Sequence, residues 1–81
     1  MFYFYILKSE KTNQYYIGST ENFDNRLVKH NSGAVRSTKN AMPWRAVFTQ
    51  NFLTLSEARR MEYKVKKWKS RIAIERLIKK I

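Results

Sequence analysis

Along this chain, dense runs of hydrophobic residues are separated by segments in which hydrophobic residues recur with the spacing of a helix. Phe2 to Lys8 and Tyr15 to Ser19 are rich in aromatic and β-branched residues, which suit a pleated strand. The short polar stretch between them, Ser9 to Gln14, contains turn-forming residues, so the two strands are expected to pair as an antiparallel hairpin. The segment Trp44 to Phe52 has the same character and predicts a third strand.

Three other segments carry the helical repeat. A helix over about residues 22–31 is predicted from Asn22 as N-cap and from the stop signal at Gly33, which suits a left-handed C′ position. Ser56 is expected to cap a second helix and Ser70 a third. The second helix has an apolar stripe formed by Ala58, Met61, Val65 and Trp68. The third is expected to bury a face formed by Ile74, Leu77, Ile78 and Ile81.

The predicted elements follow the order β-β-α-β-α-α, which belongs to the α+β class. A three-stranded antiparallel sheet flanked by helices closes such a chain around its core. Residues 1–81 are expected to form a single domain, because 81 residues leave no room for a second module. Ser32 to Pro43 lacks periodicity and is predicted to be a loop rich in hydrogen-bond donors.

The charge balance points to a polyanionic partner. Lysine and arginine number 17 against six acidic residues, a formal net charge of +11, and no acidic residue lies between Asp24 and Glu57. A hydrophobic share of 43% and an aromatic share of 15% argue against a disordered basic tail. Nucleic acid is therefore the leading partner, with an acidic membrane surface or an acidic protein as alternatives.

Cysteine is absent, which excludes disulfides, a disulfide-linked partner and thiolate metal sites. The apolar start, residues 1–7, lacks a basic leader region and is too short to span a bilayer, so a strand explains it better than a signal peptide. The expected location is the cytoplasm, with no membrane partner.

Glu62 stands out among the acidic residues because basic residues surround it on the second predicted helix. One interpretation is an ion pair with Lys66 or Arg59, since such pairs are common on helices. The other is a metal ligand, because Mg²⁺ can be held by one carboxylate, waters and substrate phosphates. The spacing alone leaves both interpretations open.

Arg26 and His30 lie four positions apart and share one face of the first predicted helix. The guanidinium could donate two parallel bonds to a phosphate, and the imidazole could move a proton near neutral pH. A solvated helix face is the alternative. The strand tyrosines are ordinarily packing residues; a phenol, with a pKa of about 10, acts as a base only where cations or a metal-bound water lower that value.

Taken together, these residues resemble the core of the GIY-YIG nuclease superfamily, in its short stand-alone bacterial branch. The segments that carry the resemblance are Tyr3-Phe4-Tyr5 in place of Gly-Ile-Tyr, the intact Tyr16-Ile17-Gly18, then Arg26, His30 to Gly33, and Ser56 to Tyr63. Larger members carry an asparagine beyond the glutamate. Here the corresponding segment, Ile72 to Glu75, has none, which we take as a trait of the short branch.

The resemblance implies a catalytic role for five residues. Tyr5 would help deprotonate the attacking water, and Tyr16 would orient that water or share the task. Arg26 would hold the scissile phosphate and neutralise charge in the transition state. His30 stands where some members place a catalytic histidine. Glu62 would hold one Mg²⁺ or Mn²⁺ ion, which acts on the leaving oxygen.

The predicted function is a divalent-metal-dependent endonuclease that cuts phosphodiester bonds, of DNA more than RNA, as in DNA repair. Gly18 is expected to allow a close backbone approach at the nucleic acid. Other predicted contacts are basic, namely Arg36, Lys39, Lys64, Lys66, Lys67 and Lys69. The alternatives are a catalytically weak or silent nucleic-acid-binding module on the same fold, and an RNA-associated or protein-interaction domain unrelated to cleavage.

Overall fold

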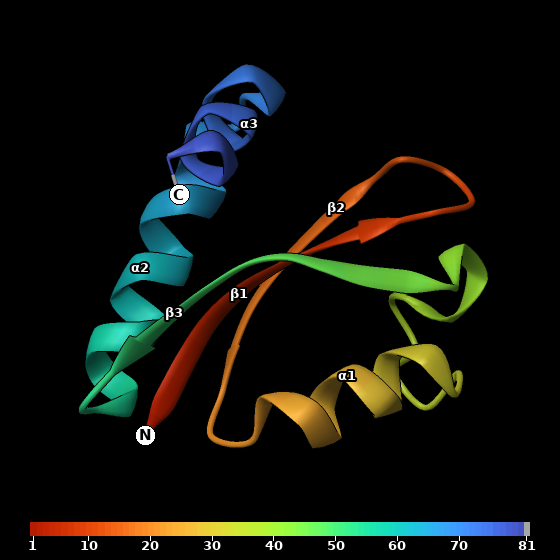
Figure 1. Cartoon of the computed structure of the whole chain (residues 1–81), viewed down its shortest axis with the longest axis horizontal. Coiled ribbons are helices and arrows are strands. Elements are labelled where there is room, and N and C mark those ends of the chain that lie inside the picture. The colour runs from red at the N-terminus through yellow and green to blue at the C-terminus, as the bar shows by residue number, and fades with distance from the viewer. Residues whose placement is uncertain (81) are drawn as a thin grey trace.

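The structure, a computed structural model, describes residues 1–80 of the chain. Its elements are β1 (Phe2–Ser9), β2 (Tyr15–Thr20), α1 (Phe23–Asn31), the 3-10 helix η1 (Lys39–Ala41), β3 (Trp44–Phe52), α2 (Leu55–Trp68) and α3 (Arg71–Lys79) (Figure 1). The predicted order β-β-α-β-α-α is confirmed. The short turn η1 lies within the stretch that was predicted to be a loop.

The three strands form one antiparallel sheet in the order β2-β1-β3. β1 is therefore the central strand, and β2 and β3 each leave one edge unpaired within the sheet. In this register Tyr5 lies opposite Gly18 of β2 and Thr49 of β3. The pairing with β3 shifts between Ile6 and Leu7. The register matters for function because it sets Tyr5 directly beside Gly18.

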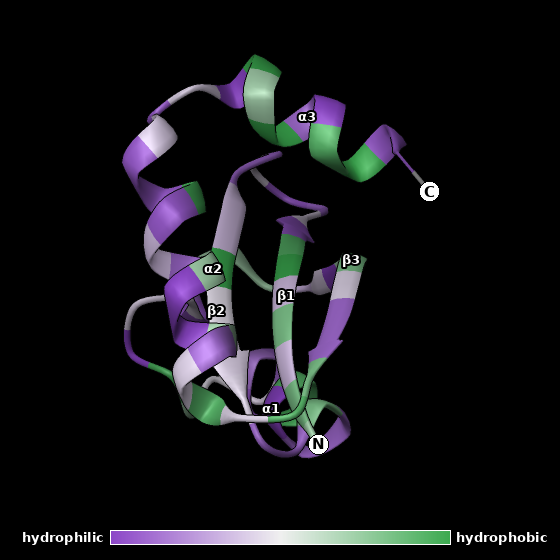
Figure 2. Ribbon diagram, turned by 90° about the vertical axis from the view of Figure 1, so that its left-hand side faces the viewer, coloured by the Kyte–Doolittle hydropathy of each residue, from purple (hydrophilic) through white to green (hydrophobic). Residues whose placement is uncertain are grey.

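Helices cover both faces of the sheet, so β1 is buried on both sides (Figure 1). Phe4 and Ile6 pack with Ile17 and Val65 in a cluster on the α2 and α3 side. Alternate side chains of a strand point to opposite faces, and a second cluster on the α1 side contains Tyr5, Leu7, Ala41 and Trp44. Figure 2 shows the apolar residues of β1 in the middle of the molecule. The sheet thus separates two small cores.

The helix ends follow the predicted signals with one exception. Asn22 and Ser70 cap α1 and α3, and Gly33 has a φ of 81°, as expected for a residue after a helix. The prediction that Ser56 caps α2 is wrong. Thr54 is the N-cap, and its side chain accepts a hydrogen bond from the backbone N–H of Glu57. Threonine with glutamate three residues later is a standard capping pattern, which favours the earlier start.

The apolar stripe of α2 faces the sheet as predicted: Ala58 and Val65 are buried, and Met61 and Trp68 are half-buried. The predicted inner face of α3 packs against the same cluster through Ile74, Leu77 and Ile78, while Ile81 lies outside the described residues. Within residues 1–80, no helix combines the length and the apolar character that crossing a membrane requires.

Candidate active site at the edge of β2

The side chains of the edge strand β2 contact the α1 side of the sheet and the α2 side in alternation. Tyr16 packs with the cluster on the α1 side, and Gly18 lies against Tyr5 on that same side. Ile17 belongs to the cluster on the α2 side, and Ser19 contacts α2 as well. This alternation is the normal two-residue period of a strand. Residues of α1 and of α2 can therefore meet around β2, although the sheet lies between the two helices.

Gly18 makes room for the phenol ring of Tyr5. A Cβ atom at position 18 would lie 2.6 Å from the Tyr5 hydroxyl oxygen and 2.7 Å from its Cζ atom. Real Cβ atoms do not approach other atoms so closely, and Tyr5 is only 1% exposed, so its ring has little space to move. The predicted contact of Gly18 with nucleic acid stays a prediction, while the space left by its missing side chain is occupied by Tyr5.

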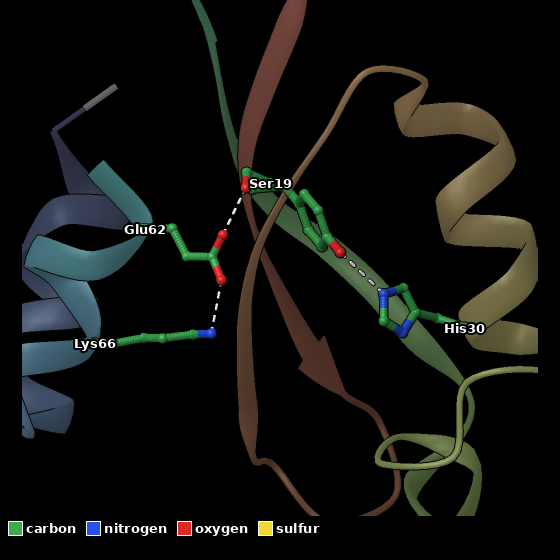
Figure 3. Close-up of polar contacts among 5 residues, drawn as sticks. Ser19, His30, Glu62 and Lys66 are labelled. Carbon is green, nitrogen blue, oxygen red and sulfur yellow. Dashed lines mark hydrogen bonds and ion pairs between the residues drawn. The ribbon is translucent and has the colours of Figure 1, made fainter. Parts of the chain in front are cut away.

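His30 links Tyr5 to the segment that follows α1. The Tyr5 hydroxyl lies 3.0 Å from His30 Nε2 (Figure 3). His30 Nδ1 lies 2.9 Å from Thr38 Oγ1. Thr38 in turn donates its own hydroxyl proton to the carbonyl of Val35, at 3.3 Å. Thr38 must therefore accept from Nδ1–H, which leaves the Nε2 lone pair to accept from Tyr5. We assign His30 as the Nδ1–H tautomer on this network.

Burial sets the ionisation of this pair. Burial, followed by the positive charge of Arg26, lowers the pKa of His30 to about 4, so the imidazole is neutral at neutral pH. Burial also raises the pKa of Tyr5 to about 12, although its interaction with Arg26 works in the opposite direction. The negative charge of the Glu62 carboxylate raises the pKa of Tyr5 further. Both groups of the hydrogen-bonded pair are therefore uncharged at neutral pH.

Four of the five predicted catalytic residues form one cluster on the α1 side. The ring of Tyr16 lies 6.3 Å from that of Tyr5 and 4.8 Å from that of His30, measured between centroids. Arg26 is half-buried beside the two phenols. Its pKa is raised, chiefly by its interaction with the Tyr5 hydroxyl and despite its own burial. The guanidinium therefore stays charged next to both hydroxyl groups.

Glu62 reaches the same strand from α2 (Figure 3). The Ser19 hydroxyl donates to its Oε1 atom at 2.5 Å, and Lys66 Nζ lies 2.6 Å from its Oε2 atom. The ion pair with Lys66 that the sequence left open is therefore present. Ser19 follows Gly18 in the chain, and the charge of Glu62 contributes to the raised pKa of Tyr5. The carboxylate thus acts on the phenol cluster from the other side of β2.

The donors around Glu62 fit a metal that is held mostly by water and substrate. Within residues 1–80 no group of three or more His, Cys, Asp or Glu side chains could hold a metal ion. The protein can offer the Glu62 carboxylate, with the Ser19 hydroxyl next to it and Lys66 already attracted to it. Mg²⁺ commonly binds through one or two carboxylates plus waters and phosphate oxygens. A single carboxylate therefore suits Mg²⁺ or Mn²⁺ better than Zn²⁺.

Two residues that shape the site were missed by the sequence analysis. Ser19 orients Glu62, and the signal was its position one residue after Tyr16-Ile17-Gly18 on the same strand. Thr38 belongs to the stretch Ser32 to Pro43 that was predicted to be a loop rich in hydrogen-bond donors, but it is 1% exposed and points inward to His30. Only the contact with the distant His30 ring distinguishes Thr38 from its neighbours, so no local pattern could identify it.

All six basic residues predicted to contact nucleic acid are exposed, but they do not form one surface. Arg36 and Lys39 lie in the connection between α1 and β3. Lys66 and Lys69 line a hollow that also contains Tyr16. The other two lysines of α2, Lys64 and Lys67, line a different hollow with Trp68. Only part of the basic surface therefore adjoins the cluster of phenols.

The three-stranded antiparallel sheet, with two phenols, a guanidinium and a carboxylate around one edge strand, is the arrangement that the resemblance to GIY-YIG nucleases implies. The comparison with known families agrees with this class. Residues 1–77 match the model of the GIY-YIG catalytic domain, and the chain belongs to that family. The predicted family and fold class are both confirmed.

Proteins from several bacteria are similar in sequence or fold to this chain. UPF0213 protein SH2523 from Staphylococcus haemolyticus is 40% identical over 65 residues, 79% of this chain and 78% of that protein. UPF0213 protein YazA from Bacillus subtilis is 36% identical over 66 residues, 80% of this chain and 66% of that protein. The solution NMR structure of UPF0213 protein BH0048 from Bacillus halodurans superimposes with a TM-score of 0.62 at 38% identity, covering 98% of this chain and 84% of that one.

Proposed function

We propose that this protein is a divalent-metal-dependent endonuclease that hydrolyses phosphodiester bonds in nucleic acid, in DNA more than in RNA. The observation that carries the proposal is that the five predicted catalytic residues lie around β2. Tyr5, Tyr16, Arg26 and His30 cluster on the α1 side, and Glu62 approaches from α2. Membership in the nuclease family and the net charge of +11 support the same proposal.

The hydrogen bond between Tyr5 and His30 suggests how water would be activated. With a pKa of about 12, Tyr5 has almost no phenolate form at neutral pH. Its oxygen can instead accept a proton from the attacking water while its own proton passes to His30 Nε2. The neutral imidazole has its lone pair in place for that transfer, because Thr38 fixes the tautomer. A positioned general base contributes roughly 10²–10⁴-fold in rate when it titrates near the working pH, and the low pKa of His30 places this relay below that optimum.

The remaining residues would bind and polarise the phosphate. Arg26 can donate two parallel hydrogen bonds to phosphate oxygens and offset the charge that develops on them. Tyr16, beside Tyr5, would orient the attacking water. A divalent ion at Glu62, when bound, supplies Lewis-acid assistance at the leaving oxygen. Ser19 keeps the carboxylate turned toward β2 through its hydrogen bond.

The test is cleavage of plasmid DNA, branched DNA and RNA by purified protein, with and without Mg²⁺ or Mn²⁺. We expect metal-dependent nicking that Glu62→Gln abolishes while nucleic-acid binding is kept. The matched control is Glu57→Gln, which removes the same charge from the exposed start of α2. Undiminished cleavage by Glu62→Gln would remove the metal assignment. Binding without cleavage under any of these conditions would favour the silent binding module instead.

A further inference from the structure

A basic groove lies next to the candidate active site, between β2 and the junction of α2 and α3. It has a volume of about 360 Å³ and is lined by residues that include Tyr15, Tyr16, Lys66, Lys69 and Arg71. Tyr16 and Lys66 belong to both places, because Tyr16 packs against Tyr5 and Lys66 pairs with Glu62. The groove therefore adjoins the site. Its lining contains three cationic side chains and no carboxylate.

Arg71 contacts two neighbouring side chains at this groove. Its guanidinium lies 4.6 Å from the centroid of the Tyr15 ring, and its Nε atom lies 3.3 Å from Glu75 Oε2. The Tyr15 hydroxyl donates to the same Glu75 oxygen, also at 3.3 Å. A guanidinium has five N–H donors, and the pair with Glu75 uses only one nitrogen. The other donors of Arg71 remain for a ligand, and the contacts with Tyr15 and Glu75 orient them in advance.

Lys69 occupies a backbone conformation that favours glycine. The chain leaves α2 through Lys69 with φ 48° and ψ 32°, in the left-handed region. The turn after α1 uses Gly33 for the same geometry, with φ 81°. A residue with a Cβ atom is less stable than glycine in this region. The chain therefore carries an ammonium group at the groove in a position where glycine would fit the backbone better.

We propose that this groove holds a backbone phosphate of the substrate strand next to the phosphate that is cut. The strand would then follow the unpaired edge of β2 from Arg26 toward Arg71, with Lys69 and Arg71 on the flanking phosphate. The proposal rests on the proposed function and assigns its substrate path. A chain of phosphates fits better than an isolated anion, because the groove and the site share Tyr16 and Lys66.

The test measures binding in the Glu62→Gln background, so that the result does not depend on cleavage. A fluorescein-labelled oligonucleotide, single-stranded or duplex, is titrated at several salt concentrations by fluorescence anisotropy. We expect Lys69→Gly to weaken binding several-fold and to lower the slope of log K against log salt by about 0.7–0.9, the value for one lost phosphate contact. Its melting temperature should be unchanged or higher, since glycine suits the left-handed position.

Two further variants distinguish a phosphate contact in the groove from an effect of total charge. Arg71→Ala should reproduce the binding defect, while Lys79→Ala, which removes one charge from the exposed end of α3, should leave the slope nearly unchanged. Equal losses for Lys69→Gly and Lys79→Ala would overturn the proposal, because they would reflect total charge alone. Competition by polyglutamate as effective as competition by unlabelled oligonucleotide would overturn it too. Absence of cleavage by the wild type would refute the nuclease while leaving this binding comparison valid.

Discussion

Acid should destabilise this protein through His30, the only histidine in the chain. The ring is fully buried against Tyr5, Tyr16 and Thr38, and its pKa falls from 6.5 to about 4, because of burial first and the charge of Arg26 second. In the unfolded chain the same ring takes up a proton near pH 6.5. Below that pH the unfolded state binds more protons than the folded state, so the free energy of unfolding falls as the pH falls.

The size of this loss follows from the two pKa values. The difference between 6.5 and about 4, at roughly 1.4 kcal/mol per pKa unit, gives a total of about 3 kcal/mol when the pH has fallen below both values. Between pH 7 and pH 5 the same pair of values predicts a loss of about 2 kcal/mol. A small domain has a stability of only about 5–15 kcal/mol, so the change is large enough to measure.

Urea denaturation at pH 7, 6 and 5 would measure this effect, with His30→Gln as the control. The glutamine amide can accept from Tyr5 and donate to Thr38 without gaining a proton, so the variant should lose little stability over this range. The wild type should lose about 2 kcal/mol more than the variant. Parallel losses in the two proteins would refute the reasoning, as would a titration of the His30 ring near pH 6.5 in the folded protein followed by NMR.

Two substitutions test the packing and the charge of the site. Gly18→Ala should cost about 1–3 kcal/mol by overpacking, because its Cβ atom would meet the buried Tyr5 ring, and urea denaturation would measure the cost; a change below about 0.5 kcal/mol would contradict the close packing. Lys66→Met should tighten Mn²⁺ binding, because loss of the ion pair frees one oxygen of Glu62. An exposed ion pair is worth about 0.2–1 kcal/mol, which corresponds to at most about a fivefold change in affinity. Unchanged affinity in calorimetry would show that the ammonium and the metal do not share that oxygen.

The sequence predicted elements best where the signals are local. The strand Trp44–Phe52 was predicted with its observed bounds, and the cap and stop of α1 were predicted from Asn22 and Gly33. The start of α2 was missed because Thr54 and Ser56 are both good caps two residues apart. The spacing to Glu57 distinguishes them, since only Thr54 lies three residues before it.

The site could be predicted only through the resemblance, because its contacts join distant parts of the chain. No periodicity indicates that Ser19 meets Glu62 or that Thr38 turns inward to His30. The sequence alone could predict that the basic residues of α2 lie on different sides of the helix. Lys64 and Lys66 are two positions apart on a helix, about 200° around its axis, so they point to nearly opposite sides of it.

The sheet separates α1 on one face from α2 and α3 on the other, and this has a consequence for the newly made protein. Tyr5 and His30 are positioned by packing against α1 and the segment after it, whereas Glu62 depends on α2 docking from the opposite face. A chain in which α2 has not yet docked lacks the carboxylate beside the phenols. The proposed cutting activity would thus appear only once folding is complete, which would spare nearby nucleic acid from half-formed copies.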